Sequence, residues 1–404
     1  MKSRGFCFRS ICVLSIGLTV GLAKANPNDA LQFFAGYGVV YDDNLFRLRP
    51  GTNAQQTIGR DSAAETIKTA TAAVGFDKKY GLQRIRARLT AVDYQYQNFD
   101  YLDFTALNFV GLVNWSFTPK ASGVVGIDRQ QLPSGFEDFK RYTIRNQATV
   151  INGRAEGFYE LDGAWQVTGA FLHLDVKNAA TIIQQRAFTR ESVQVGLKRT
   201  FGSESEVAYR IRSGSGDYSD TANSAAAFLP NGFDDIENEF QLKLVITPKS
   251  SLAARISYLQ KKFHNFAFRD YSGITGDATF IWGLTDRTSI QFIASSLLSD
   301  YQTTYSNSVR AVRYAIMPTI QIKEKVAVKL RQEYVQRSFD GVVSGFSSAL
   351  KRDDNTHLTR VSVDWDPREQ LGFSFWFQKE RRESNYGDFS YSSKSVGILA
   401  RTSF

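Results

Sequence analysis

The chain has 404 residues, 13% of them aromatic, and a formal net charge of +9. Its two cysteines, Cys7 and Cys12, both lie near the amino terminus, so the sequence that follows excludes disulfides, cysteine-ligated metals and a cysteine nucleophile. No apolar run approaches the roughly 18 residues that a membrane-spanning helix requires, and the modest charge gives no argument for nucleic acid as a partner.

The first 25 residues have the layout of a cleavable signal peptide. Three basic residues precede an apolar run from Ile11 to Leu22, and Ala23-Lys24-Ala25 supplies the small residues of a cleavage site. We therefore expect residues 1–25 to be removed. Residues 26–404 are expected to form one secreted domain, because no linker or change of composition divides them.

From Leu31 to Phe404, apolar and polar residues alternate in segments of about 10 to 14 residues, which is typical of strands with one apolar face. Eight short connections join these segments in pairs, at residues 78–81, 119–122, 161–163, 201–205, 248–250, 286–288, 323–325 and 367–370. Eight turns require about sixteen flanking strands. A first strand near residues 31–43 and a last near 391–404 bring the expected number to about 18, within a range of 16 to 20.

A strand-rich chain in lipid must close its sheet, because every backbone N–H and C=O needs an internal partner. The pattern therefore predicts the all-β class, as a transmembrane antiparallel β-barrel in the outer membrane of a Gram-negative cell, in contact with lipid. The longer connections, such as 44–62, 133–144, 218–234 and 340–354, are expected to face outward. About eighteen strands leave a wide interior, so any plug would be an outer loop folded inward.

Aromatic residues and one proline refine this layout. A girdle of aromatic side chains belongs at the membrane interface, and Trp115, Trp165, Trp282 and Trp365 each lie within about four residues of a short connection. The chain ends at Phe404 on an alternating segment, which resembles the signal read by the outer-membrane insertion machinery. Pro318 falls inside an expected strand, where its missing N–H predicts a bulge.

With the apolar faces toward lipid, a set of mostly basic side chains points into the lumen. A guanidinium group offers paired donors to carboxylate, sulfate or phosphate, and its plane can stack on sugar or aromatic rings. We therefore expect a path for acidic, hydrated polymers or solutes, lined by Arg84, Arg86, Arg88, Arg210, Arg212, Arg255, Lys329, Arg331 and Arg360. The alternative is that these residues only pair with acidic neighbours such as Glu239, Glu333 and Asp364.

Enzymatic and cofactor-dependent functions find little support in the sequence. The three histidines, His173, His264 and His357, are expected near the outer ends of strands, and no two have metal-ligand spacing. No phosphate-binding glycine loop, zinc motif or calcium loop occurs. We therefore expect no enzyme, no cofactor and no metal, and an aspartate–histidine or serine–histidine pair assembled across strands is the remaining route to hydrolysis.

The expected first strand ends in Tyr-Asp-Asp-Asn-Leu-Phe-Arg, residues 41–47. This segment resembles the large outer-membrane barrels encoded with exopolysaccharide operons, the EpsL type associated with exosortase systems. The resemblance implies a passive pore that exports a polysaccharide, expected to be anionic, with periplasmic export or co-polymerase proteins as partners. A general or solute-specific porin is the alternative. Asp42, Asp43 and Asn44 are also good turn formers, so a tight outer turn explains the segment without a polymer.

Overall fold

The computed structural model describes residues 30–404 apart from 139, 141, 146, 180–185, 203, 220–228, 302, 304–305 and 342–350. The expected signal peptide at residues 1–25 lies outside this described part. A helix long and apolar enough to cross a membrane is not found among the described residues.

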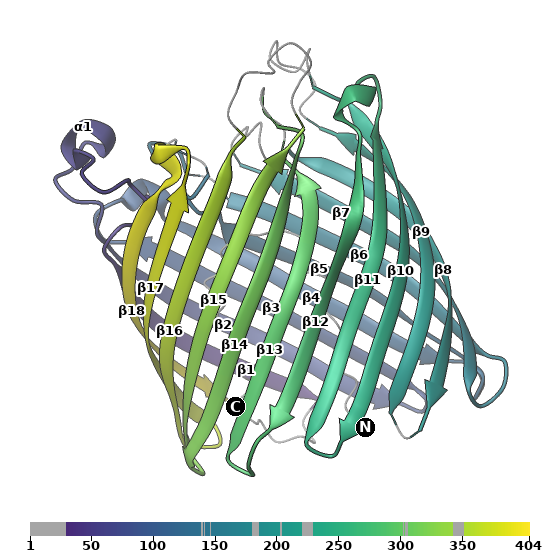
Figure 1. Ribbon diagram of the computed structural model, residues 1–404. Helices are drawn as coiled ribbons and strands as arrows, with labels where there is room; N and C mark the ends of the chain where they lie inside the picture. Colours follow the sequence, from purple (N-terminus) through teal and green to yellow (C-terminus); the bar gives the residue numbers. More distant parts are fainter. Residues whose placement is uncertain are drawn as a thin grey trace.

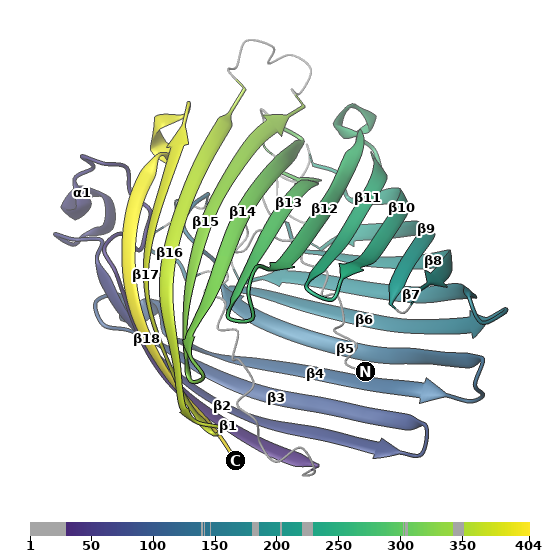
Figure 2. The ribbon, with the colours of Figure 1, turned by 60° about the horizontal axis from the view of Figure 1, so that its bottom comes forward.

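Eighteen strands of the described chain form one closed antiparallel barrel (Figures 1 and 2). They are β1 (Leu31–Asp42), β2 (Glu65–Tyr80), β3 (Gln83–Tyr96), β4 (Phe104–Ser116), β5 (Ala121–Pro133), β6 (Gln147–Glu160), β7 (Trp165–Asn178), β8 (Phe188–Phe201), β9 (Ser205–Tyr218), β10 (Gly232–Thr247), β11 (Ser250–Phe263), β12 (Tyr271–Gly283), β13 (Thr288–Asp300), β14 (Ser308–Lys323), β15 (Val326–Asp340), β16 (Asp353–Arg368), β17 (Leu371–Ser384) and β18 (Tyr391–Ser403). Each strand pairs with its sequence neighbours, and β1 also pairs with β18. No sheet edge is left open, which confirms the expected class and strand number.

The seam of the barrel continues to the last residue of the chain. Strand β1 pairs with β18 from Phe34 opposite Ser403 to Asp42 opposite Ser395. Beyond this register, the backbone N–H of Phe33 donates to the carbonyl of Phe404 at 3.1 Å, and the N–H of Phe404 donates to the carbonyl of Phe33 at 2.9 Å. The backbone of Phe404 is therefore part of the ladder that closes the wall.

The two ends of the barrel differ in the length of their connections, as Figure 1 shows. Eight connections of two to four residues lie at the lower end, where the sequence predicts them. The connections at the upper end have six or more residues and carry α1 (Ala54–Ile58), η1 (Asp100–Leu102), η3 (Ala267–Arg269) and η4 (Gly387–Phe389). In a bacterial outer-membrane barrel the short turns are periplasmic, so the upper end is the outer mouth.

Side chains on the strands alternate between an apolar face and a mixed face. Large apolar residues such as Leu89, Val193 and Phe377 are exposed on the first face, as expected of a wall that contacts lipid. The aromatic girdle occurs where the sequence predicts it, at the ends of strands next to short turns; Trp282 is 41% and Trp365 44% exposed. The fifth tryptophan, Trp376, differs because it lies in the middle of β17 and on the other face.

The bulge expected at Pro318 is wrong. Ile316 pairs with Gln332 and Thr319 with Lys329, so the register between β14 and β15 is the same on both sides of the proline. Pro318 still pairs with Ile290 on β13. A missing N–H removes one bond of the ladder but does not require an inserted residue, and the register shift of this strand pair occurs instead after Gln321.

Candidate functional site: the inner wall and the inward loop

One outer connection folds across the mouth of the barrel and identifies the inner face of the wall. Its described residues, 134–138, 140 and 142–145, are called the inward loop here; the connection joins β5 to β6, yet Asp138 contacts Arg337 on β15 and Arg382 on β17. Because β5 and β15 belong to different sides of the ring, this contact is made across its opening. Arg337 therefore faces the lumen, and the two-residue period of the strand places Arg331 on the same face.

The connection expected at residues 133–144 lies at the outer end of the barrel, as the sequence predicts, but its described residues fold inward, because the largely buried carboxylate of Asp138 is bound by the opposite side of the barrel. The expectation that an outer loop would supply any plug agrees with the observed position of the loop. Of the other long connections, parts of 218–234 and 340–354 lie outside the described residues.

Asp138 is held by three arginines from the opposite side of the barrel, called the arginine triad here: Arg337 of β15, Arg352 just before β16, and Arg382 of β17. Arg337 donates to both carboxylate oxygens at 2.8 Å, Arg352 donates at 2.8 Å and Arg382 at 3.2 Å. Burial favours the neutral acid, but the triad outweighs it and holds the pKa of Asp138 well below its usual range. Beneath the triad, the fully buried Asp354 accepts bonds from Arg352 at 2.6 and 3.0 Å and from Arg337 at 3.3 Å.

An aromatic cluster beside the triad carries the rest of the inward loop. Phe46, which is 0% exposed, lies at its centre, with ring centroids 4.6 Å from Phe136 and 4.7 Å from Phe99. The ring of Tyr142 lies 5.5 Å from Phe46. The loop therefore contributes two aromatic side chains to a cluster formed by the connections after β1 and β3 and by the outer ends of β2, β3 and β4.

Residues 41–47, which carry the resemblance described above, contact both this cluster and the inward loop. Asp42 accepts two bonds from Arg47, at 2.9 and 3.0 Å, and a third from Ser393 at 2.8 Å. Arg47 has a positive φ of 54°, and its carbonyl accepts a bond from Lys140 of the inward loop at 3.0 Å. Burial and the neighbouring Arg382 lower the pKa of Lys140 to about 8. The segment thus forms the outer turn that the sequence predicts, and it also supports the inward loop.

The residues expected along the lumen fall into two groups. Six of the nine form ion pairs, in agreement with the alternative interpretation of their role: Arg84 with Asp77, Arg210 with Glu239, Arg212 with Glu237, Arg255 with Asp277, Lys329 with Asp364 and Arg331 with Glu333. These contacts link neighbouring strands or residues of one strand. Their charges are largely compensated by the wall itself.

The other three residues, Arg86, Arg88 and Arg360, form no ion pair with any described residue. The guanidinium carbon of Arg88 lies 4.7 Å from the ring centroid of Phe34, and that of Arg360 lies 4.2 Å from the ring centroid of Trp376. An aromatic ring is a weak partner that leaves the N–H donors at the edge of the guanidinium group available.

Sequence reasoning missed the arginine triad and Asp138. Arg337 could have been predicted, because it continues the alternation of Lys329 and Arg331 along β15. Asp138 carries no local signal, since it contacts residues about 200 positions away in a connection without periodicity.

Two histidines of the described part of the chain lie next to an acidic side chain. The imidazole of His264 lies 3.1 Å from Asp234, and that of His173 lies 3.6 Å from Glu191. No hydroxyl group of the described residues is hydrogen-bonded to either ring. The described residues also contain no group of three or more histidine, cysteine or acidic side chains that could hold a metal ion.

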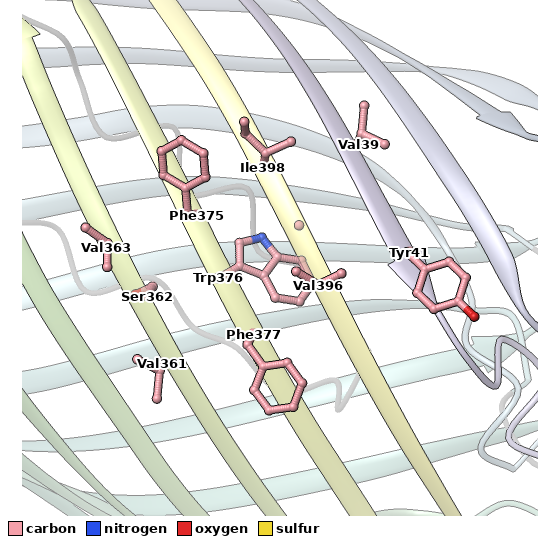
Figure 3. Close-up of a pocket in the computed structure, with 11 residues that line it drawn as sticks. Val39, Tyr41, Val361, Ser362, Val363, Phe375, Trp376, Phe377, Val396 and Ile398 are labelled. Carbon is pink, nitrogen blue, oxygen red and sulfur yellow. The ribbon is translucent and has the colours of Figure 1, made fainter.

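A separate hollow of about 470 Å³ lies on the lipid-facing side of the seam, between β16 and β1 (Figure 3). Its side chains are almost entirely apolar, and they include Tyr41, Phe375, Phe377 and Ile398. Because these residues alternate with the inward-facing ones, the hollow opens toward the membrane and is no part of a solute path.

Comparisons with known proteins agree with an outer-membrane barrel. Residues 242–404 match the family model described as "Putative beta-barrel porin 2". In fold, the chain is similar to OccK2 (OpdF) of Pseudomonas aeruginosa, solved in complex with glucuronate, with 8% identity, a TM-score of 0.51 and coverage of 93% of this chain and 98% of that one. It is also similar to OccAB4 of Acinetobacter baumannii, with 11% identity, a TM-score of 0.50 and coverage of 94% and 100%. No curated protein matches.

The chain is therefore an outer-membrane β-barrel with a porin-like fold. The expected location is confirmed, and lipid contacts the apolar face of the wall.

Proposed function

We propose that this barrel is a porin for small anionic solutes, above all carboxylates. The observation that carries the proposal is the set of three lumenal arginines, Arg86, Arg88 and Arg360, that form no ion pair with any described residue. In a water-filled lumen such groups attract anions and offer planar, paired donors to a carboxylate.

The positions of the basic groups suggest a route across the membrane. Arg337 and Arg382 lie near the outer ends of β15 and β17, Arg360 lies in the middle of β16, and Arg88 and Arg86 lie toward the periplasmic end of β3. All of them belong to the continuous arc of wall from β15 through the seam to β3. Exposed ionic contacts contribute on the order of 0.2 to 1 kcal/mol each, which is enough to enrich anions along this arc without trapping them.

The comparisons support a porin and suggest a probe for testing it. The matched family is described as a porin, and OccK2, a barrel of similar fold, was solved with glucuronate. The likeness to OccK2 is one of fold, so glucuronate serves here as a probe with one carboxylate, and its neutral counterpart is glucose.

Export of an anionic polysaccharide is the second candidate function, and the resemblance of residues 41–47 favours it. Two observations weaken it. Residues 41–47 have a structural role, because they support the inward loop. The loop also lies across the outer mouth, through which a polymer would have to leave. A deletion strain that releases a normal amount of extracellular polysaccharide would exclude this function.

The anion-porin proposal can be tested in planar bilayers with a salt gradient. Wild-type protein should give a reversal potential that shows anion preference, and the triple variant Arg86→Ser, Arg88→Ser and Arg360→Ser should lose most of it. The matched control is Asp77→Ser with Arg84→Ser, which removes an ion pair from the same part of the wall without changing net charge. Cation preference of the wild type, or unchanged selectivity in the triple variant, would contradict the proposal.

A further inference from the structure

The arginine triad has a charge imbalance that the wall does not correct. Arg337, Arg352 and Arg382 bring three positive charges together, and the wall supplies two buried carboxylates near them: Asp354, which bonds to the triad, and Glu380, which lies close to Arg382. The third carboxylate, Asp138, belongs to the inward loop. Without Asp138, the wall carboxylates Asp354 and Glu380 would leave the three guanidinium groups one positive charge in excess.

The geometry around Asp138 is that of a carboxylate-binding site. Arg337 holds both of its oxygens at 2.8 Å in the paired arrangement that suits a carboxylate, and Arg352 and Arg382 add single bonds to one oxygen. The guanidinium groups are fixed from behind: that of Arg352 lies 3.5 Å from the ring centroid of Phe389 and donates to Asp354. The donors are therefore in place before any ligand arrives.

We infer that the arginine triad is a receptor for the carboxylate of an incoming solute, and that Asp138 is a tethered competitor that occupies it when no solute is present. A solute that takes the place of Asp138 releases this contact of the inward loop and widens the mouth. The inference rests on the proposed function, because it assumes that anionic solutes enter from outside, and it adds a binding site and a means of opening.

Competition of this kind is physically reasonable because one carboxylate replaces another in the same site. Displacing Asp138 leaves it in water, and the incoming carboxylate makes the same charge-assisted bonds, so neither state leaves a buried charge unpaired. The remaining contacts of the loop, Phe136 and Tyr142 in the aromatic cluster, keep it near the mouth and allow it to return.

The test uses the full chain in planar bilayers and records the fraction of time at the highest conductance level. For the wild type, glucuronate should increase this fraction and glucose at the same concentration should not. The Asp138→Asn variant loses the charge-assisted bonds between Asp138 and the triad. Its ratio of open to closed time should therefore be about tenfold higher than that of the wild type in the absence of glucuronate. It should no longer respond to glucuronate.

The matched control is Asp128→Asn on β5, which removes one carboxylate outside the inward loop; Asp128 is bonded to Asn152 and Gln130 and not to the triad. It should keep the wild-type response to glucuronate. Equal effects of the two sugars on the wild type, or a wild-type response in Asp138→Asn, would overturn the inference. The wild-type titration decides the matter if the Asp138 variant fails to fold. Anion preference with no effect of glucuronate would refute the receptor alone, whereas cation preference would refute the proposed function.

Discussion

The guanidinium carbon of Arg360 lies 4.2 Å from the ring centroid of Trp376, and the indole on its other side covers Gly397 of β18. A Cβ atom at position 397 would lie 2.5 Å from Cε2 of the indole, closer than any relaxed contact. Glycine at this position therefore allows the largest lumenal side chain to lie flat against the wall, where it supports an arginine without an ion pair.

Gly397→Ala should push Trp376 and Arg360 into the lumen. We expect a lower single-channel conductance and a loss of about 1 to 3 kcal/mol in the free energy of unfolding, as is usual when a packed contact is overfilled. Conductance in bilayers and denaturant titration in detergent measure the two effects. The control is Gly169→Ala on β7, where an added Cβ meets nothing within 4 Å. Unchanged conductance in Gly397→Ala would show that the indole can move without entering the path.

Phe46→Ala should release the inward loop while leaving the barrel intact. Phe46 is fully buried between Phe99 and Phe136, and truncation of such a ring costs about 3 to 5 kcal/mol. Because the rings that Phe46 contacts, those of Phe99, Phe136 and Tyr142, lie in outer connections, we expect the loss to fall mainly on the loop and not on the strand ladder. We expect larger and noisier currents with an unchanged heat-induced shift in gel migration.

A lipid-facing ring provides the comparison for Phe46. Phe377→Ala removes an exposed phenyl group of β17 that lies on the outer face of the wall, so it should leave the current as it is in the wild type. Wild-type currents in Phe46→Ala would mean that the loop is held in place by Asp138 and its other polar contacts.

The strands could be predicted from the sequence because their signals are local. The period of two, Gly and Pro residues at short turns, and tryptophans at strand ends all act within a few residues, and they placed the first and last strands within one residue of the observed bounds. The same alternation also placed Arg86, Arg88 and Arg360 on one face.

The candidate site could be predicted only in part, because its contacts join distant segments. Nothing near Asp138 in the sequence indicates Arg337, 199 residues away. The ion pairs depend on how neighbouring strands are aligned, which the alternation does not specify. Arg84 forms an ion pair with Asp77 on the neighbouring strand. Arg86 lies directly opposite Asp77 but forms no ion pair with a described residue. The positive charge on the inner face could therefore be predicted, but the acidic residues that neutralise it could not.

Phe404→Ala should separate assembly from stability. The backbone of Phe404 exchanges two hydrogen bonds with Phe33, which alanine retains, and its side chain is 69% exposed. We therefore expect the folded variant to unfold within about 0.5 kcal/mol of the wild type, as exposed substitutions usually do. If the terminal ring is read during insertion, the amount of protein in the outer membrane should fall.

Denaturant titration and quantification of membrane fractions measure these two properties of the Phe404 variant separately. A large loss of stability in the purified variant would mean that the ring packs against lipid or neighbouring residues more than its exposure indicates. A normal amount of the variant in the outer membrane would show that the ring is not part of the insertion signal.

The anion preference should also depend on pH through Lys140, whose pKa is lowered from 10.5 to about 8 by burial and by Arg382. Below pH 8 the ammonium group adds a positive charge to the mouth, and above pH 8 that charge is lost. The released loop should recover a pKa near 10.5, so between about 8 and 10.5 it binds more protons than the docked loop, and docking becomes tighter as pH rises through this window. Both effects lower the anion preference between pH 7 and pH 9.

Reversal potentials measured from pH 6 to 9.5 should therefore show a midpoint near 8 in the wild type. In Lys140→Gln the curve should be flat and at the level of the high-pH wild type, because the amide does not titrate. Lys140→Arg should keep the anion preference up to pH 9.5, since a guanidinium group remains charged there. A midpoint near 8 that persists in Lys140→Gln would assign the titration to a different group and leave the inward loop without a role in the pH dependence.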